Sequence, residues 1–574
     1  MRAQITKKST PMNRLLSLMM MAGALLMTVP ARAAAPGITT NTATAGSFTL
    51  TAQEAYLNQP DGNQVYSWGY GCTALGTPSF RPTLPNQTCN TMQVPGPTLI
   101  VTENQPVSVT LTNNLPAPAG NTSILFPDFN VTTSCTAAAP SGVKGLLTCE
   151  AAHGSSVTYT FTATTPGTHA YYSGTQGDLQ IEMGLYGALI VLPASPPTVC
   201  GSLGVSPSAT TGLPVTNPGA NSKARAFWGE SDFRLAAAAY DHPGTCYDRE
   251  YLFQFAEMDL NIHRAALAQV TNPRIVAACA TGPSSPGCSL EVPTEPYHPN
   301  YFIINGRSMP DDMDPNFDGV YPHQPYNGNP HMHPGEEVLV RVIGQGRWQH
   351  PFHEHGNHVR ILARDGNLIT SQSTITYAGT TTPVPALAGI LLFTTDTTPG
   401  QAFDGIFYWS GRGLNWDPFA HNPGSSDPAA NLHCTPDANG YNTGAPTAIN
   451  YYEWCQDHNK PLQVAPFGDA PGGGPATLPD PNIFTNGAWY GGTPYLGPDA
   501  TLRGGNPACA STTNANCTLL QPANTQANPA NERGWAFMWH SHNEREITTN
   551  NVFPGGMLMM MLVDSREFVI DESM

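Results

Sequence analysis

Residues 107–116 read VSVTLTNNLP, and much of the chain repeats this kind of pattern. Val107, Val109 and Leu111 alternate with small polar residues until the turn-prone Asn-Asn-Leu-Pro ends the run. Successive side chains of a strand point to opposite faces, so the pattern is typical of a strand with one buried and one solvated face. A continuous apolar run follows at 187–192, and the same alternation recurs at Val157, Tyr159 and Phe161. Strands of this kind, separated by Gly and Pro, predict antiparallel β-sandwiches.

We expect an all-β protein of two Greek-key β-sandwich domains. The first domain spans 34–195 and the second 225–574, joined by a polar, Pro- and Gly-rich linker at 196–224. Periodicity is lost at about 411–533, which predicts a long loop-rich insertion in the second domain, because uninterrupted loops of that length are uncommon. One short helix is predicted, near Leu235–Tyr240. The strands of the second domain are predicted at Tyr251–Met258, Tyr301–Asn305, Glu337–Ile343, Gly405–Trp409, Trp535–His542 and Gly556–Val563.

The composition excludes several classes of protein. Only 11% of the 574 residues are charged, and 41 acidic residues outnumber 24 lysines and arginines, which gives a net charge of −17. An acidic chain lacks the basic surface that nucleic acid requires, so we expect no nucleic-acid partner. Glycine and proline, at 55 residues each, disfavour a coiled coil, and the 40% of hydrophobic residues argues against global disorder.

The first 33 residues have the layout of a secretory signal peptide. A positively charged start is followed by an apolar run at Leu15–Val29 and by the small-residue sequence Ala31-Arg32-Ala33. The run is shorter than the ~20 residues of a spanning helix and no later stretch reaches that length, so we expect no transmembrane span. Cleavage would remove five positive charges and take the net charge from −17 to −22. We therefore predict an exported protein, located in the periplasm, outside the cell or at the cell surface.

Twelve cysteines fit an oxidising compartment after export. They fall into close sequence neighbours and none has CxxC spacing, so disulfides are favoured over metal ligation. The expected pairs are Cys72/Cys89, Cys135/Cys149, Cys200/Cys246, Cys279/Cys288, Cys434/Cys455 and Cys509/Cys517.

Two clusters of histidines carry the chemistry: HPFHEHGNH at 350–358 and HSH at 540–542. Residues i and i+2 share one face of a strand, so His353 and His355 form one pair and the histidines of HSH another. Two such pairs on adjacent strands would bring four imidazoles within reach of one ion. Neutral imidazole suits copper, zinc, iron and nickel, and the Irving–Williams order favours copper(II), with zinc the weaker candidate. The alternative is a set of exposed or hydrogen-bonded histidines that hold no metal.

These motifs resemble those of the multicopper oxidase family, whose domains are cupredoxin sandwiches. In the first domain, VPGPTL at 94–99 is similar to the family's N-terminal signature, and GLYGALIV at 184–191 to the strand that closes that domain. In the second, HPFHEHG at 350–356 resembles the HPxHLHG motif. WHSH at 539–542, which continues to PGGM at 554–557, resembles the terminal HCH motif. The resemblance covers both sandwiches but not the insertion, and it implies cupredoxin-like domains, a copper cofactor and oxidoreductase activity.

The resemblance also implies a role for each matching residue. His353 matches the type 2 copper ligand, and His355, His540 and His542 match type 3 ligands. His350 matches a type 1 ligand, and Met557 lies near the family's axial methionine position.

The chain departs from the family pattern at two places. Ser541 stands between two histidines where the family has the cysteine of its blue copper site, and a hydroxyl does not replace a soft thiolate. The first domain has TSILFP at 122–127 and HAYYSG at 169–174 where the family has histidine pairs. We therefore expect a diminished copper site of one or two ions without an intense blue band at roughly 600 nm. Its predicted ligands are His353, His355, His540 and His542, with His350 near them.

Several neighbouring residues could support this site. Glu354, between two of the ligands, could orient an imidazole N–H or face solvent. His358 and Met557 are weaker candidate ligands. HMH at 331–333 could add ligands, although a surface turn is the favoured interpretation, and core packing is favoured over copper(I) binding for the methionines of 557–561.

The function implied by the resemblance is that of a copper-dependent oxidoreductase, and the signal peptide predicts that it is exported. Its partner would be a one-electron donor, either a phenol or a metal ion, with dioxygen as a possible acceptor. The alternative is a copper-binding, surface or scaffold protein that has lost catalysis together with its cysteine. A mononuclear zinc site is a third interpretation.

Overall fold

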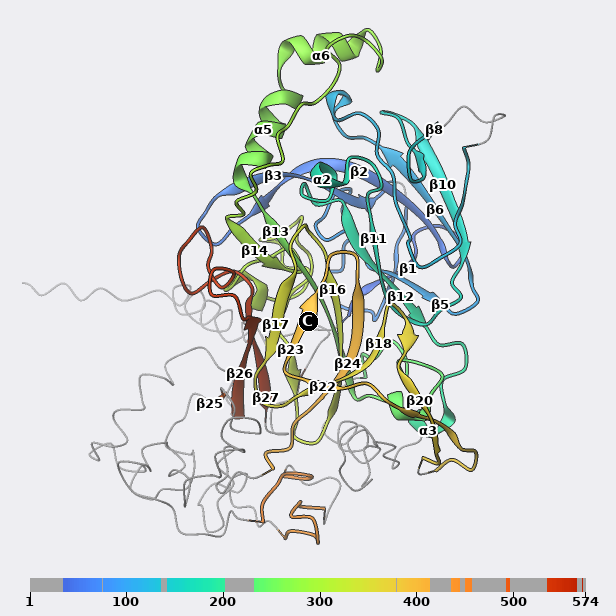
Figure 1. Cartoon of the computed structure of the whole chain (residues 1–574), viewed down its shortest axis with the longest axis vertical. Helices are drawn as coiled ribbons and strands as arrows, with labels where there is room; N and C mark the ends of the chain where they lie inside the picture. Colours follow the sequence, from blue (N-terminus) through green and yellow to red (C-terminus); the bar gives the residue numbers. More distant parts are fainter. Residues whose placement is uncertain are drawn as a thin grey trace, which may run out of the picture.

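The computed structural model describes residues 35–74, 76–135, 142–201, 232–377, 379–412, 435–443, 450–456, 492–495, 534–564 and 570. Strands dominate these residues and the helices are few and short, which confirms the all-β prediction (Figure 1). None of the helices in these ranges is long and apolar enough to cross a membrane. The predicted signal peptide lies outside the described residues.

Strands from residues 37–192 form the first sandwich. One sheet has the order β11 (Gly167–Tyr172), β12 (Tyr186–Leu192), β5 (Leu99–Thr102), β1 (Gly37–Thr40), β4 (Ser79–Arg81). The other has the order β3 (Gln64–Cys72), β2 (Ser47–Asn58), β6 (Pro106–Asn113), β10 (Ser156–Thr162), β7 (Thr132–Thr133). The remaining elements are short: β8 (Val143–Lys144), β9 (Cys149–Glu150), η1 (Ala117–Ala119), α2 (Gly177–Gln180) and α3 (Thr198–Gly201).

The alternating sequence of β6 accounts for its place in this sandwich. Val107, Val109 and Leu111 are at most 2% exposed and join a core cluster with residues of both sheets. The strand pairs antiparallel with β10, with Val109 opposite Tyr159, and parallel with β2. The predicted strand and its buried face are both confirmed.

The second sandwich is built from residues 249–564. One sheet has the order β14 (Tyr301–Ile304), β13 (Arg249–Met258), β16 (Glu337–Gly344), β24 (Ala402–Tyr408), β18 (Val359–Arg364), β19 (Asn367–Leu368), and β22 (Leu391–Leu392) also pairs with β18. The other has the order β15 (His331–Met332), β27 (Leu558–Asp564), β26 (Gly534–Ser541), β17 (His350–Glu354), β23 (Thr394–Thr397), and β25 (Gly492–Tyr495) also pairs with β26. The other elements are β20 (Thr370–Ile375), β21 (Val384–Leu387), η2 (Pro243–Thr245) and η3 (Asp311–Met313). All six strands predicted for this domain are present, with ends shifted by at most a few residues.

Large aromatic side chains fill the second core. Phe352 of β17 packs against Phe255 of β13 and Trp539 of β26, with ring centroids 4.8 and 6.0 Å apart. Met557, Met559 and Met561 are fully buried in the same cluster. Core packing, the favoured interpretation of these methionines, is confirmed.

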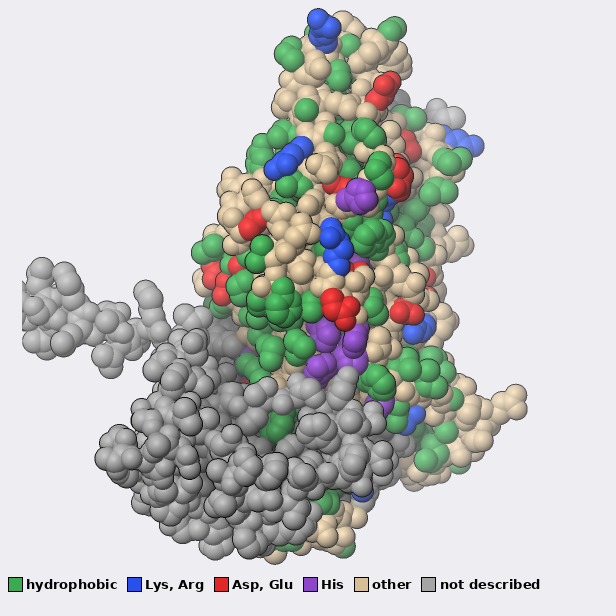
Figure 2. All heavy atoms as spheres, turned by 60° about the vertical axis from the view of Figure 1, so that its left-hand side comes forward, with side chains coloured by type: hydrophobic (Ala, Val, Ile, Leu, Met, Phe, Trp, Pro, Cys, Tyr) green, Lys and Arg blue, Asp and Glu red, His purple; other side chains and the backbone are tan. Residues whose placement is uncertain are grey.

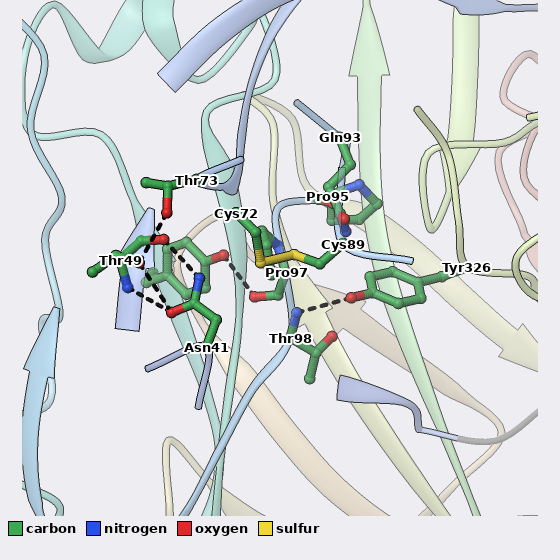
Figure 3. The surroundings of a disulfide bond; sticks show 11 residues. Asn41, Thr49, Cys72, Thr73, Cys89, Gln93, Pro95, Pro97, Thr98 and Tyr326 are labelled. Atoms are coloured by element: carbon green, nitrogen blue, oxygen red, sulfur yellow. Dashed lines mark hydrogen bonds between the residues drawn. A yellow bond between two sulfur atoms is a disulfide. The ribbon is translucent and has the colours of Figure 1, made fainter. Parts of the chain in front are cut away.

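Polar contacts join the two sandwiches. Asp404 of β24 accepts hydrogen bonds from the backbone N–H and the hydroxyl of Thr168 on β11. Tyr326, from the second half of the chain, accepts a hydrogen bond from the backbone N–H of Thr98 at 3.0 Å, close to the Cys72–Cys89 disulfide (Figure 3). The two sandwiches are thus held in a fixed relation, with β11 against β16 and β24 (Figure 1).

The cysteine pairing follows the predicted neighbours wherever both partners are described. The disulfides are Cys72–Cys89, Cys135–Cys149, Cys200–Cys246 and Cys279–Cys288. Cys434, Cys509 and Cys517 lie outside the described residues, so the other two predicted pairs stay predictions.

The helix prediction was wrong in position. Residues 235–240 form bends and an isolated bridge between Ala238 and Cys246, because this segment is held by buried side chains rather than by helical hydrogen bonds. The two longest described helices are α5 (Leu260–Val270) and α6 (Pro273–Ala280), which extend together from the sandwiches (Figure 1). Asp259 and Asn272 cap their N-termini by accepting backbone hydrogen bonds, and this capping signal was present in the sequence.

Most of the predicted linker at 196–224 and of the insertion at 411–533 lies outside the described residues. One described piece of the insertion, β25, pairs antiparallel with β26, with Gly492 opposite Phe537. The domain boundaries stay predictions.

Candidate metal centre

Two neighbouring strands position the histidines. β17 and β26 run antiparallel, with His353 opposite His540 and Phe352 opposite Ser541. The inward residues of both strands, such as Phe352 and Trp539, belong to the core, so alternation turns His353 and His540 to the opposite face of the sheet. After His355 the chain turns at Gly356 (φ 99°), where an added Cβ would lie 2.8 Å from the ring of Phe537.

The imidazoles of His353, His355 and His540 form a compact group. Each offers one ring nitrogen, and the three nitrogens lie within 4.8 Å of one another. The Nε2 atoms of His355 and His540 are 3.2 Å apart. His542 lies beside them and is exposed, with its ring centroid 4.6 Å from that of His353 and 5.5 Å from that of His540. The structure therefore brings together the four histidines of the two predicted pairs.

The tautomer of His540 is set by its neighbour. Its Nδ1 lies 2.6 Å from the backbone oxygen of Ser541, and a carbonyl oxygen only accepts, so Nδ1 carries the proton. Nε2 then presents its lone pair to the group. Burial lowers the pKa of His540 to about 4, although the bond to Ser541 opposes this shift. The imidazole is thus neutral at pH 7, as a metal ligand must be.

His353 is held in the same way by a side chain of the next strand. Its Nδ1 lies 2.5 Å from the hydroxyl oxygen of Thr394 on β23. Burial and, after it, the neighbouring imidazoles of His355, His542 and His540 together lower the pKa of His353 to about 3. A group of imidazoles that cannot all be protonated together is suited to share a cation.

The group is open to solvent on one side. Figure 2 shows histidine side chains gathered at the surface, bordered by hydrophobic and acidic side chains. Phe393 borders His353, with ring centroids 5.5 Å apart, and also His358, at 4.9 Å. His358 is half-buried, and burial lowers its pKa. It is not one of the three histidines whose nitrogens converge.

His350 lies apart from this group, contrary to the expectation that it would stand beside the copper ligands. It is on the inward face of β17, where its Nδ1 is 2.9 Å from Glu546 and its Nε2 is 2.9 Å from Glu257. Burial alone would lower the pKa of His350, but the hydrogen bonds and charges of the two glutamates raise it to about 9. Both ring nitrogens are engaged by carboxylates, so neither is available to a metal.

Glu354 neither orients an imidazole nor faces solvent. Its side chain is fully buried on the inward face of β17, and neither of its oxygens has a hydrogen-bond partner among the described residues. Burial raises the pKa of Glu354 well above its usual value, so the carboxyl group is neutral. Met557 is part of the core, as described above.

The other candidate histidines are also committed to protein contacts. His331 and His333 are buried rather than in a surface turn, and their Nδ1 atoms lie 2.6 and 2.9 Å from the carboxylate and the backbone oxygen of Asp564. In the first sandwich, His169 is bound to Asp128 through Nδ1 and to the backbone oxygen of Thr165 through Nε2.

The donor set of the surface group fits a copper or zinc ion. All its ligand atoms are imidazole nitrogens, which suit both metals, and His540 is already fixed in the tautomer that ligation needs. The partners that hold these ligands were not predicted. Thr394 and Phe393 follow the short strand β22, in a segment whose sequence carries no histidine or cysteine signal.

A comparison with protein families matches residues 82–196 to the family described as "Multicopper oxidase". The expected resemblance to this family is thereby confirmed for the first sandwich. No curated protein matches the sequence.

Solved structures similar to the chain include the multicopper oxidase mgLAC, with 14% sequence identity, 90% of this chain and 86% of that chain covered, and a TM-score of 0.41. A blue copper oxidase from Nitrosomonas europaea has 12% identity, covers 90% of this chain and 85% of its own, and has a TM-score of 0.40. A copper nitrite reductase from the same organism has 17% identity, with 63% of this chain and 84% of that chain covered and a TM-score of 0.35.

Proposed function

We propose that the protein is an exported copper-binding oxidoreductase that acts on a one-electron donor at the histidine group of β17 and β26. The observation that carries this proposal is the convergence of three imidazole nitrogens within 4.8 Å on neighbouring strands. The resemblance of residues 82–196 to multicopper oxidases favours copper over zinc.

In this proposal His353, His355 and His540 hold the ion, with His542 at the open side. Bound copper supplies one-electron redox chemistry. The Ser541 carbonyl and the Thr394 hydroxyl fix the ring planes of His540 and His353, which lowers the cost of organising the ligands. The buried position of these two rings excludes water from the inner side of the site.

The surroundings favour a phenol over a metal ion as the electron donor. Phe393 contacts the ring of His353 and is 39% exposed, and Leu391 and Ile390, two and three positions before it, are 50% and 62% exposed. An aromatic donor could stack on this apolar surface within reach of the histidines. It would lose one electron and its hydroxyl proton, and dioxygen would be the final electron acceptor.

The test begins with metal content. Purified mature protein loaded with copper should hold one or two ions per chain, and His353→Ala and His540→Ala should each lower that number. His298→Ala, at an exposed histidine that is not one of the converging group, is the matched control. If the two variants retain as much copper as the control, the proposed site is wrong.

A non-catalytic copper-binding or scaffold protein is the second candidate. Ser541 in place of a thiolate ligand and the absence of a histidine pair from the matching first-domain segments favour it. Oxygen uptake by the copper-loaded protein separates the two functions, measured with a phenol and, separately, with Mn(II) or Fe(II). Uptake that depends on His540 supports the oxidoreductase, and none with any of these donors supports the scaffold.

Export is tested on the protein made by living cells. N-terminal sequencing should find a chain that begins just after Ala33, in the periplasmic or extracellular fraction. A chain that keeps its first residues inside the cell would contradict this part of the proposal.

A further inference from the structure

Ser541 lies in a buried polar network where the family resemblance implies a blue copper site. Blue copper requires two histidines, a cysteine thiolate and a weak axial ligand, commonly methionine. His350 and Met557 match two of these, but the hydroxyl of Ser541 donates a hydrogen bond to Glu546. The same oxygen of Glu546 also bonds to Nδ1 of His350, and the backbone oxygen of Glu546 accepts from the N–H of Met557. The residues present do not fit a blue copper ion.

The protons of this network follow from its donors and acceptors. Each nitrogen of His350 is 2.9 Å from a carboxylate oxygen, one of Glu257 and one of Glu546. An ionised carboxylate only accepts, so two ionised partners require an N–H on both nitrogens of the ring. His350 is then an imidazolium ion between two carboxylates, and all three side chains are at most 1% exposed.

The remaining carboxylate lone pairs are satisfied as well. Glu257 accepts the backbone N–H groups of Arg347 and Trp348 at 2.7 and 2.8 Å. The second oxygen of Glu546 accepts from the side-chain amide of Asn543 at 2.9 Å. A closed set of this kind stabilises two buried negative charges around a single positive one.

We infer that protonated His350 serves as a built-in cation in the place where the resembling family holds its blue copper, and that this pocket takes up no metal. Insertion of an ion would have to displace the proton of at least one ring nitrogen and break its bond to a carboxylate. Among the described residues, metal-dependent redox chemistry is then left to the surface histidines, which a donor must reach directly.

The protonation state can be measured without any metal. In metal-free protein at pH 7.5, long-range proton–nitrogen NMR spectra of 15N-histidine-labelled chain should show both nitrogens of His350 protonated. His350→Gln identifies the signal by its disappearance, and Glu257→Gln identifies it by a shift if the first variant does not fold. One unprotonated ring nitrogen on His350 overturns the inference. This result does not depend on whether the surface histidines bind copper.

Substitution of Ser541 provides a second test. Ser541→Cys supplies the missing thiol, yet copper(II) should give no intense band near roughly 600 nm and no increase in copper per chain, because His350 remains bound to Glu546. The matched variant S541C/E546H removes that carboxylate and supplies a second imidazole, and it should gain the band and one more copper ion. An intense band in Ser541→Cys alone overturns the inference.

Discussion

His350 and His353 are three residues apart on one strand, and their surroundings give them opposite chemistry. His353 faces outward among other imidazoles, and its pKa falls to about 3, so it is a neutral electron-pair donor. His350 faces inward between Glu257 and Glu546, and its pKa rises to about 9, so it is a cation. Both rings are buried, so burial alone does not distinguish them. The face of the strand therefore decides whether a histidine can bind a metal, because one face offers other imidazoles and the other offers carboxylates.

The largest expected effect comes from removing one side of the inward ion pair. Glu257→Ala leaves the His350 cation with a single carboxylate and two backbone N–H groups without an acceptor, which should cost about 3–5 kcal/mol of unfolding free energy. Chemical denaturation measures it. Glu295→Ala, which removes a carboxylate that is 72% exposed and bonded to Arg347, should cost less than about 1 kcal/mol. Equal losses in the two variants would contradict the assigned roles.

The next effect concerns the outward group. His540→Ala removes a ligand whose lone pair is already oriented, and copper affinity should fall about 100-fold or more. His350→Gln should leave copper affinity unchanged within about twofold. Competitive titration with a copper chelator measures both. The comparison fails if the inward substitution weakens copper binding as much as the outward one.

The inward network also predicts a pH dependence of stability. The folded-state pKa of His350 is raised from 6.5 to about 9, so its contribution is fully present below pH 6.5 and is lost as the pH rises through 9. Of the groups that face it, Glu257 and Glu546 accept from the ring, while the Tyr297 hydroxyl lies 3.2 Å from Glu257 and donates at 2.5 Å to Glu182. Unfolding free energy should fall by on the order of 3 kcal/mol between pH 6.5 and 9.5, because one pKa unit corresponds to about 1.4 kcal/mol. The same titration of His350→Gln should lack this decrease, and a decrease of equal size there would assign it to other groups.

The smallest expected effect on copper affinity comes from removing the hydroxyl that orients His353. Thr394→Val keeps the shape of the side chain but removes the hydroxyl that bonds to His353, and copper affinity should fall about tenfold. Thr395→Val is the control, because Thr395 is the next residue on the same strand, is more buried than the half-buried Thr394, and its hydroxyl has no hydrogen-bond partner among the described residues. If both variants bind copper equally, the hydroxyl of Thr394 does not orient the ligand.

The sequence predicted those features that local patterns determine. Alternation at Val107–Leu111 identified a strand and its buried face, and the i, i+2 spacing at 353–355 and 540–542 anticipated the outward histidine group. Close spacing in the sequence also predicted the four described disulfides. Each of these features depends on residues that are near one another along the chain.

Features that depend on distant partners were not predicted. Glu257 meets His350 from 93 positions away, on a strand of the other sheet, and nothing in its local sequence indicates this contact. The prediction that His350 lies near the copper ligands was wrong, because His350 is on the inward face of β17. Strand alternation already puts His350 and His353, three residues apart, on opposite faces. The expected helix at 235–240 failed because a short apolar segment does not distinguish a helix from a bridge buried by tertiary contacts.

The most direct test of the central claim is the electron paramagnetic resonance spectrum of the mature protein loaded with copper(II). The account predicts a copper signal with nitrogen coupling from several imidazoles, without thiolate character, that is lost in His540→Ala and retained in His350→Gln. A protein that binds no copper, or a signal that His540→Ala leaves unchanged, would contradict it.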